Sequence, residues 1–200
     1  MEEPGVETQP LKRICVTVDR ATGVISVEND GEGIPVQMHP DHAVYVPELI
    51  FGHMLTSANY DDTEERTIGG QNGIGAKACN IYSKWFEIET VDAARKKVYT
   101  QRFEDNMTIV GKPKILSCSK KPYTRVTFLP DYARFGLANG LDDDMHSLIV
   151  RRVYDVTAVT GPEVNVSLNG KKLMYKTFER YCDLYIGPTI PKSAPNRWAT

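Results

Sequence analysis

Two glycine-rich elements constrain this 200-residue chain more than any other feature. The first ends an alternating apolar and polar run, which indicates a β-strand, and reads Asn29-Asp30-Gly31-Glu32-Gly33. The second follows a long polar loop, leads into a run with helical period, and reads Gly69-Gly70-Gln71-Asn72-Gly73-Ile74-Gly75-Ala76-Lys77. Glycine tolerates backbone conformations that other residues resist, so both elements predict unusual chain paths at which function can sit.

Hydrophobic periodicity and turn residues define the expected secondary structure. The expected strands span residues 12–20, 24–27, 85–90, 97–103, 124–129, 164–168 and 171–174. The expected helices span residues 47–56, 76–83 and 141–160. This order predicts an α+β fold of two layers, in which helices cover one face of a mixed, mostly antiparallel sheet.

Local signals support three of these elements. Pro47 suits the first turn of a helix. An acidic run, residues 142–144, places negative charge at the start of the last expected helix. Asn169-Gly170 is the strongest short signal for a β-hairpin in the chain.

Composition excludes several classes of protein. No apolar run approaches the roughly 20 residues needed to span a bilayer, so no membrane partner is expected. The formal net charge of -2 is spread over both signs, so a polyanion such as DNA would have to be held by other parts of a larger protein. The four cysteines lie far apart without a CxxC pair, which favours reduced, mostly buried thiols over a zinc or redox site.

The second glycine-rich element has the chemistry of a phosphate cradle. Its glycines let successive backbone N–H groups converge on an anion, and Lys77 adds a full positive charge. It is not a P-loop, because the Gly-Lys-Ser/Thr spacing is absent. A dinucleotide fold is also disfavoured, because the segment departs from Gly-x-Gly-x-x-Gly at the third glycine and follows a loop instead of a strand.

The first element offers a different group, the carboxylate of Asp30. An ionised carboxylate only accepts hydrogen bonds, so in a partly apolar pocket it suits the exocyclic amino group of adenine. Considered without any other motif, Asp30-Gly31 is better explained as the closing of a turn.

Four blocks, taken in order, closely resemble the ATPase domain of eukaryotic type II DNA topoisomerases. The blocks are residues 29–35, 46–52, 55–62 and 69–83. The resemblance extends, more weakly, over nearly all of residues 12–186. It implies the Bergerat (GHKL) fold, a two-layer sandwich. In that family the domain binds ATP with Mg²⁺.

The resemblance assigns roles to particular residues. Asp30 would take the adenine amino group, Ser57 and Asn59 would contact the ribose and phosphates, and Lys77 would neutralise phosphate charge. Ala58 stands where a second serine is usual, which puts one hydrogen bond in doubt. The implied ATP-binding residues are Asp30, Gly33, Ser57, Ala58, Asn59, Gly70, Gln71, Asn72, Gly73, Ile74, Gly75, Ala76 and Lys77.

The sequence differs from the family at its N-terminal end. In the family, a helix before the first strand carries a glutamate that activates water and an asparagine that binds Mg²⁺. Residues 1–11 contain Pro4 and Pro10, so we expect a tail in place of that helix. We therefore assign no catalytic residue and no metal ligand, and we expect very slow hydrolysis by this chain alone. Residues 12–186 would form the nucleotide-binding domain and residues 187–200 a linker towards a transducer domain, so the chain resembles a domain truncated at both ends.

The resemblance implies a part of an enzyme. In an intact type II topoisomerase, ATP-driven formation of a homodimer gates DNA strand passage, and DNA is held through other domains. The family expectation is a nuclear protein, with an organellar or viral enzyme as the alternative. A second hypothesis is a catalytically inactive nucleotide-binding remnant or truncated gene product.

Overall fold

The computed structural model describes residues 10–53, 73–175 and 177–187. Its strands are β1 (Arg13–Val18), β2 (Ile25–Asn29), β3 (Ser83–Asp92), β4 (Lys97–Glu104), β5 (Ile109–Val110), β6 (Lys114–Ser117), β7 (Tyr123–Pro130), β8 (Asn165–Leu168) and β9 (Lys171–Lys172). Its helices are α1 (Val46–Gly52), α2 (Gly75–Ile81), the 3₁₀ turn η1 (Tyr132–Phe135), α3 (Asp143–Val159) and α4 (Phe178–Ile186). Every expected strand and helix is present, while β5, β6, η1 and α4 were not foreseen.

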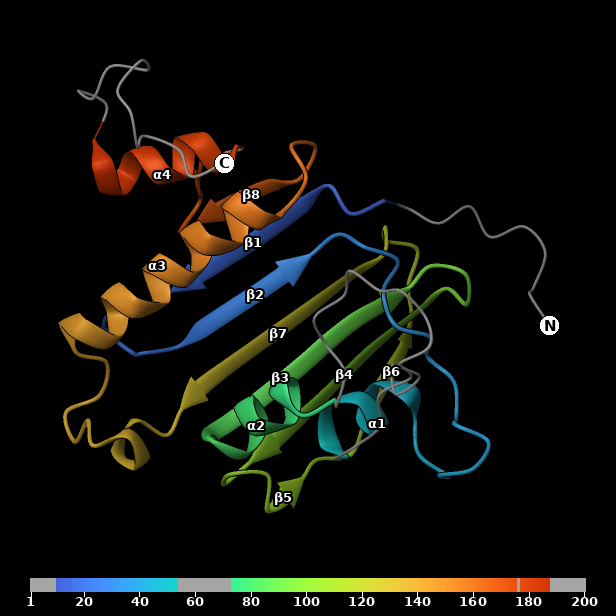
Figure 1. Ribbon diagram of the computed structural model, residues 1–200. Helices are drawn as coiled ribbons and strands as arrows, with labels where there is room; N and C mark the ends of the chain where they lie inside the picture. The colour runs from blue at the N-terminus through green and yellow to red at the C-terminus, as the bar shows by residue number, and fades with distance from the viewer. Residues whose placement is uncertain (1–9, 54–72, 176, 188–200) are drawn as a thin grey trace, which may run out of the picture.

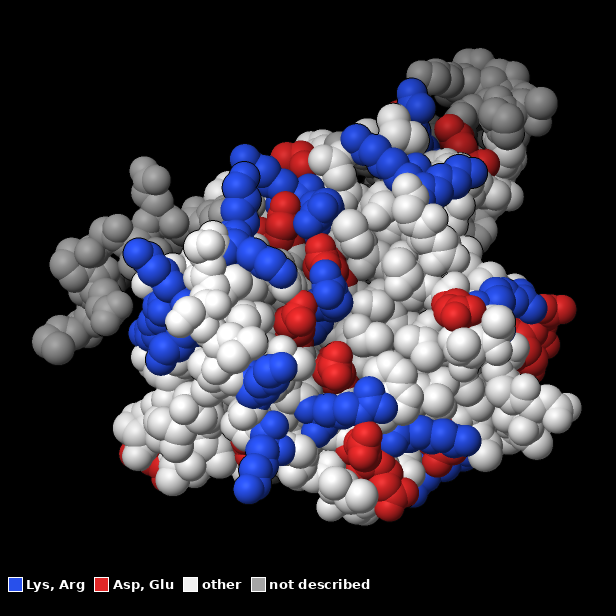
Figure 2. Space-filling model, turned by 180° about the vertical axis from the view of Figure 1, so that it is seen from behind, with Lys and Arg blue, Asp and Glu red and all other residues white. Residues whose placement is uncertain are grey.

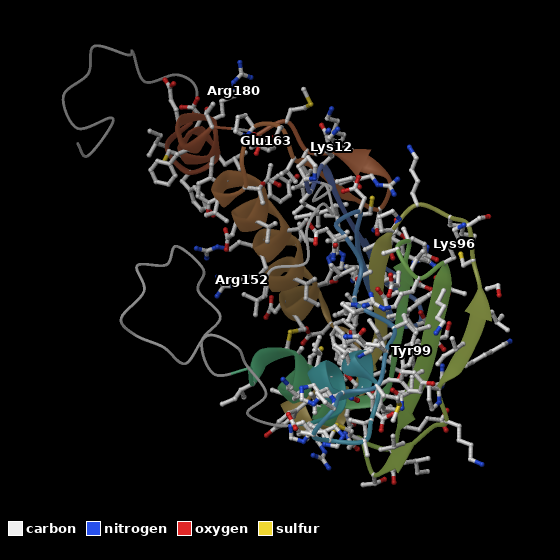
Figure 3. All side chains as sticks on the ribbon, turned by 90° about the vertical axis from the view of Figure 1, so that its right-hand side faces the viewer. Lys12, Lys96, Tyr99, Arg152, Glu163 and Arg180 are labelled. Carbon is white, nitrogen blue, oxygen red and sulfur yellow. The ribbon has the colours of Figure 1, made fainter. Side chains whose placement is uncertain are left out.

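The strands form one sheet in the order β5-β4-β3-β7-β2-β1-β8-β9, with β6 paired to β4. Only β1 and β8 pair in parallel among the strands of the described residues. Helices α1, α2 and α3 lie on one face of this sheet (Figure 1), and the view from the side shows the two layers (Figure 3). The predicted two-layer α+β fold with a mixed, mostly antiparallel sheet is therefore confirmed.

Two apolar clusters fill the space between the layers. One packs α3 against β1, β2 and β8 and includes Val16, Ile25 and Val153. The other packs α1 against β3 and β4 and includes Phe51 and Phe86. Each buried apolar side chain contributes roughly 1.5 to 3 kcal/mol, so these two clusters fix the positions of the helices.

The local signals act as the sequence predicts. Pro47 lies in the first turn of α1, and the Asp142 side chain caps α3 by accepting from the backbone N–H of Met145 at 2.8 Å. Asn169 and Gly170 take the positive φ angles of 48° and 78° that a tight hairpin turn requires. Helix α1 ends at Gly52, and its expected end at Thr56 lies outside the described residues.

Two other expectations concern the thiols and the membrane. The four cysteines are free thiols, as expected, and each is partly buried. Within the described ranges, no helix is both long and apolar enough to cross a bilayer.

The face of the sheet opposite the helices carries intermixed Lys, Arg, Asp and Glu side chains (Figure 2). In its register, Glu28 of β2 lies opposite Arg125 of β7, which lies opposite Glu89 of β3. The Arg125 guanidinium bonds Glu28 at 2.6 Å and Glu89 at 3.1 Å. This ionic row ties together three neighbouring strands near the end of β2.

Replacement of Arg125 with methionine tests the ionic row. Arg125→Met leaves both carboxylates without this partner, but the Arg125 side chain is 42% exposed, so water screens the ion pairs. We expect the free energy of unfolding to fall by about 1 kcal/mol at low salt, with a smaller loss at about 1 M NaCl. Urea unfolding at both salt concentrations measures this, and an equal loss at both would contradict an ionic origin.

Candidate functional site

The structure describes part of the predicted ATP site. Asp30, Gly33 and residues 73–77 lie within the described ranges. The remaining predicted residues, Ser57, Ala58, Asn59, Gly70, Gln71 and Asn72, lie outside them.

Asp30 follows the last residue of β2 and holds the start of β1. Its Oδ1 accepts hydrogen bonds from the backbone N–H groups of Lys12 at 2.9 Å and Arg13 at 2.7 Å. Its own N–H donates to the Arg13 carbonyl at 3.2 Å. These bonds give Asp30 a structural role at the strand end, in line with the turn-closing alternative that the sequence left open.

The side chain of Asn29 belongs to the helix-bearing face of the sheet. Successive side chains of a strand point to opposite faces, and residues directly opposite on antiparallel strands share a face. Asn29 lies opposite Ile14 of β1 and Thr124 of β7. Ile14 lines the groove beneath α3, so Asn29 and Thr124 point to that side as well. By the same alternation, Glu28 points to the other face.

Thr90 of β3 extends this line of polar side chains. It lies opposite Thr124, and the two hydroxyl oxygens are 3.0 Å apart. Asn29, Thr124 and Thr90 thus form a polar row across three strands, at the edge of an otherwise apolar face. Asn29 and Thr124 were not among the site residues expected from the sequence, although the alternation of Ile25, Val27 and Asn29 predicts that the Asn29 side chain shares the face of Ile25 and Val27.

The segment after β2 crosses close to the end of β3. Gly33 has a φ of +78°, and a Cβ added there would lie 2.1 Å from the Val91 carbonyl oxygen. The backbone N–H of Ile34 donates to Thr90 Oγ1 at 2.9 Å, and that of Val36 donates to Asp92 Oδ2 at 2.8 Å. Burial raises the pKa of Asp92, but hydrogen bonds from Val36 and Arg95 outweigh it and hold this pKa below its usual value. Two bonds and one glycine therefore fix the path of this segment.

The second glycine-rich element enters α2 as the sequence predicts. Gly73 has a φ of +60°, and α2 begins at Gly75. Lys77 lies in the first turn of α2 and is only 3% exposed, and this burial lowers the pKa of its ammonium. Helix α2 lies on the helix-bearing side of the sheet (Figure 1), and the strand register places the polar row on the same side.

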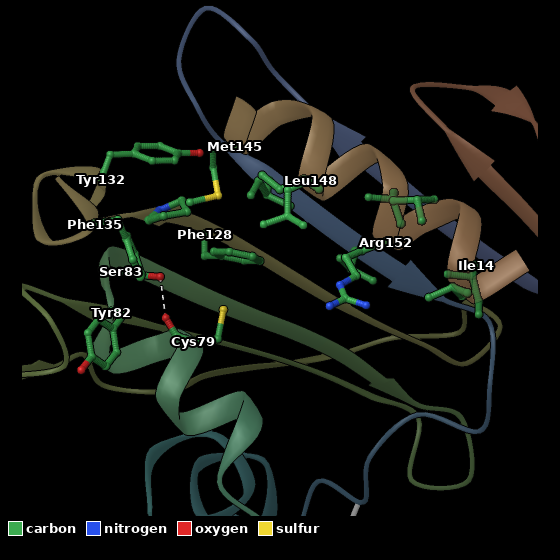
Figure 4. Close-up of a pocket in the computed structure, with 17 residues that line it drawn as sticks. Ile14, Cys79, Tyr82, Ser83, Phe128, Tyr132, Phe135, Met145, Leu148 and Arg152 are labelled. Carbon is green, nitrogen blue, oxygen red and sulfur yellow. Dashed lines mark hydrogen bonds between the residues drawn. The ribbon is translucent and has the colours of Figure 1, made fainter. Parts of the chain in front are cut away.

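A groove of about 500 Å³ runs between α2 and α3, over strands β1, β2 and β7 (Figure 4). Ile14 lies at the end near Arg152, and Tyr132 and Phe135 lie at the other end. Its lining is apolar apart from a few groups such as Arg152 and Ser83, and neither Asp30 nor Lys77 belongs to it. The complete lining consists of Ile14, Val16, Ile25, Val27, Cys79, Tyr82, Ser83, Phe128, Pro130, Tyr132, Phe135, Met145, Leu148, Ile149, Arg152, Val153 and Val156.

Comparisons with known proteins agree with this geometry. No protein-family model matches the chain. It is 50% identical over 175 residues to DNA topoisomerase 2 of Penicillium chrysogenum and 47% identical over 182 residues to that of Saccharomyces cerevisiae. The solved ATPase region of Saccharomyces cerevisiae topoisomerase II superposes with a TM-score of 0.84 at 47% identity, covering 88% of this chain and 46% of that one.

The chain belongs to the family of type II DNA topoisomerase ATPase regions. The resemblance inferred from the sequence is thereby confirmed. The ATPase and transducer domains of Balamuthia mandrillaris DNA topoisomerase II give a TM-score of 0.83 at 44% identity, with 88% of this chain and 45% of that one covered. The 43K ATPase domain of Thermus thermophilus gyrase B, at 24% identity and a TM-score of 0.61, shows the shared GHKL fold alone.

This type II topoisomerase relative spans only part of the proteins it matches. The match covers 88% of this chain but 11% of the Penicillium chrysogenum protein, and 90% of this chain but 13% of the Saccharomyces cerevisiae protein. The activity, substrates and partners of those whole proteins are therefore inferences for this chain.

Substitution of Gly33 tests the close approach of the segment after β2 to the end of β3. We expect Gly33→Ala to lower the free energy of unfolding by at least about 2 kcal/mol, because the new methyl meets the Val91 carbonyl at a positive φ. The matched control is Gly75→Ala, since a Cβ at Gly75 meets nothing within 4 Å, and there we expect no loss. Thermal unfolding of both variants measures the difference, and equal stability of the two would contradict the close approach.

Proposed function

We propose that this chain is the ATP-binding domain of an ATP-dependent type II DNA topoisomerase. One observation carries the proposal: the polar row and the glycine-rich entrance to α2 lie on the same side of the sheet, in a chain 47% identical to a solved ATPase region. The adenine would lie at the polar row. The phosphates would lie at the second glycine-rich element.

At the adenine end, we assign the base contact to the Asn29 side chain, with Asp30 as its support. The Asn29 amide oxygen accepts one hydrogen bond from the backbone N–H of Gly31 at 3.2 Å, and its second lone pair accepts from the exocyclic amino group of adenine. The Thr124 hydroxyl lies in the same row. Asp30 was the residue expected from the sequence, but its Oδ1 already accepts two backbone N–H groups. Its role is to hold β1 and β2 together beneath Asn29.

At the phosphate end, we keep the roles that the resemblance implies. Ser57, the Ala58 backbone and Asn59 contact the ribose and phosphates, and backbone N–H groups of residues 70–76 surround the triphosphate. Lys77 adds a positive charge from the first turn of α2. A buried ammonium interacts strongly with a phosphate, because little water screens the pair.

Mg²⁺ would neutralise phosphate charge during hydrolysis. The described residues contain no group of three His, Cys, Asp or Glu side chains that could hold a metal ion, so we assign no Mg²⁺ ligand among them. In the family, the glutamate and asparagine for this step belong to a helix that precedes the first strand.

In the whole protein, nucleotide binding would favour a homodimer of two such domains and so gate DNA passage, with DNA held through other domains. We propose a nuclear location, which is the expectation for the family. A viral or organellar location is the alternative, since the relatives include DNA topoisomerase 2 of Acanthamoeba polyphaga mimivirus at 48% identity. The competing function, a catalytically inactive remnant, would bind nucleotide without turnover.

Calorimetric titration with a non-hydrolysable ATP analogue and Mg²⁺ tests the nucleotide site. We expect measurable affinity in the unmodified chain. We expect Asn29→Leu and Lys77→Ala each to weaken it by about tenfold or more, as for loss of a contact worth roughly 1.5 to 3 kcal/mol.

The matched control is Glu28→Gln, because Glu28 neighbours Asn29 in β2 but bonds Arg125 on the opposite face. This variant should bind the analogue as tightly as the unmodified chain. Absence of binding by the unmodified chain would overturn the proposed function. Equal loss in Glu28→Gln and Asn29→Leu would overturn the assignment of the adenine contact.

A further inference from the structure

Asn80 of α2 is a buried side chain that the proposed nucleotide contacts do not use. It is 1% exposed, and its Nδ2 donates to the carbonyl oxygen of Phe51 at 3.1 Å. Its Oδ1 is buried and has no hydrogen-bond partner among the described residues. The amide is therefore only half satisfied.

A half-satisfied buried amide stabilises the fold less than an apolar side chain of the same shape would. A buried polar atom without a partner carries a desolvation cost, whereas an apolar side chain of the same shape carries none. Leucine has nearly the shape of asparagine and would fill this position between the helices. The presence of asparagine therefore points to a requirement other than packing.

The hydrogen bond from Asn80 to Phe51 joins α2 to α1, the helices before and after residues 54–72. Phe51 lies in the last turn of α1, where the backbone N–H of His53 donates to the Leu49 carbonyl at 3.2 Å. Residues 54–72 lead from α1 to Gly73, and α2 then begins at Gly75. Asn80 thus links the helix before this segment to the helix after it.

Helix α1 is itself attached to the sheet through a second polar contact. The buried Gln101 of β4 donates from Nε2 to Glu48 of α1 at 2.9 Å and to the Gly111 carbonyl at 3.0 Å. The hydroxyl of Tyr99 donates to Gln101 Oε1 at 2.6 Å. A continuous set of hydrogen bonds therefore runs from β4 through α1 and Asn80 to α2.

We propose that Asn80 is a positioning residue, which fixes α2 against α1 so that Gly75 and Lys77 are held where a phosphate group of the nucleotide binds. The inference rests on the proposed function, because it names a residue that supports the same site. Asn80 does not touch the nucleotide. It acts through the Phe51 carbonyl.

Asn80→Leu separates positioning from stability. This substitution removes the bond to Phe51 and also the unpaired Oδ1, so we expect little change in the thermal unfolding midpoint. Without nucleotide, we expect amide hydrogen exchange at His53 and Ala78 to become about fivefold faster, because each helix loses its link to the other. We expect affinity for the non-hydrolysable ATP analogue to fall by about threefold to tenfold.

Asn106→Gly is the matched control. Asn106 Nδ2 donates to the Ile81 carbonyl at 3.0 Å, so it makes the same kind of bond at the same C-terminal end of α2 but does not link α2 to α1, and its φ of +55° suits glycine. This variant should keep the exchange rate at His53 and the affinity for the analogue. If both variants lose affinity equally, the effect is general loosening of α2 and the inference fails.

The exchange measurement keeps this inference distinct from the proposed function. If the unmodified chain binds no nucleotide, the proposed function fails, and the positioning role for a phosphate fails with it. If the unmodified chain binds but Asn80→Leu leaves exchange and affinity unchanged, the proposed function stands and only the role of Asn80 is overturned.

Discussion

The alternation of side chains along β2 is the constraint on which the site depends. Ile25, Val27 and Asn29 share the helix-bearing face, while Ser26 and Glu28 share the other. On the outer face, the ionic row through Arg125 holds β2, β7 and β3 together. On the inner face, the same three strands supply the polar row. A slip of one residue in the register would exchange the two faces and turn Asn29 away from the helices.

Much of the fold could be predicted because local chemistry determines it. Asn169-Gly170 specifies a tight turn, Pro47 and Asp142 mark helix starts, and alternation identifies the long strands. The parallel pairing of β1 with β8 could not be predicted, because it joins segments separated by most of the chain and no local signal encodes it. The short strands β5 and β6 have too few residues to show a period.

For the adenine contact, the residue expected from the sequence differs from the residue that we propose, for a specific physical reason. The carboxylate of Asp30 is the better acceptor in isolation, so chemistry considered residue by residue favours it over the neighbouring amide. The structure uses that carboxylate to hold Lys12 and Arg13, and it places Asn29 on the face where a ligand would lie. The groove between α2 and α3 could not be predicted from the sequence either, because its apolar lining comes from six separate elements. The solved ATPase-region chain is about twice as long as the part of it that this chain covers.

The central claim is that one nucleotide occupies the helix-bearing side of the sheet, from the polar row to the start of α2. The most direct measurement is a heteronuclear NMR titration of the isotope-labelled chain with a non-hydrolysable ATP analogue. The account predicts shifts for the Asn29 side-chain amide and for the backbone amides of Thr124 and Lys77, with little change at Glu104 on the outer face. Shifts concentrated on the outer face, with Asn29 and Lys77 unmoved, would contradict it.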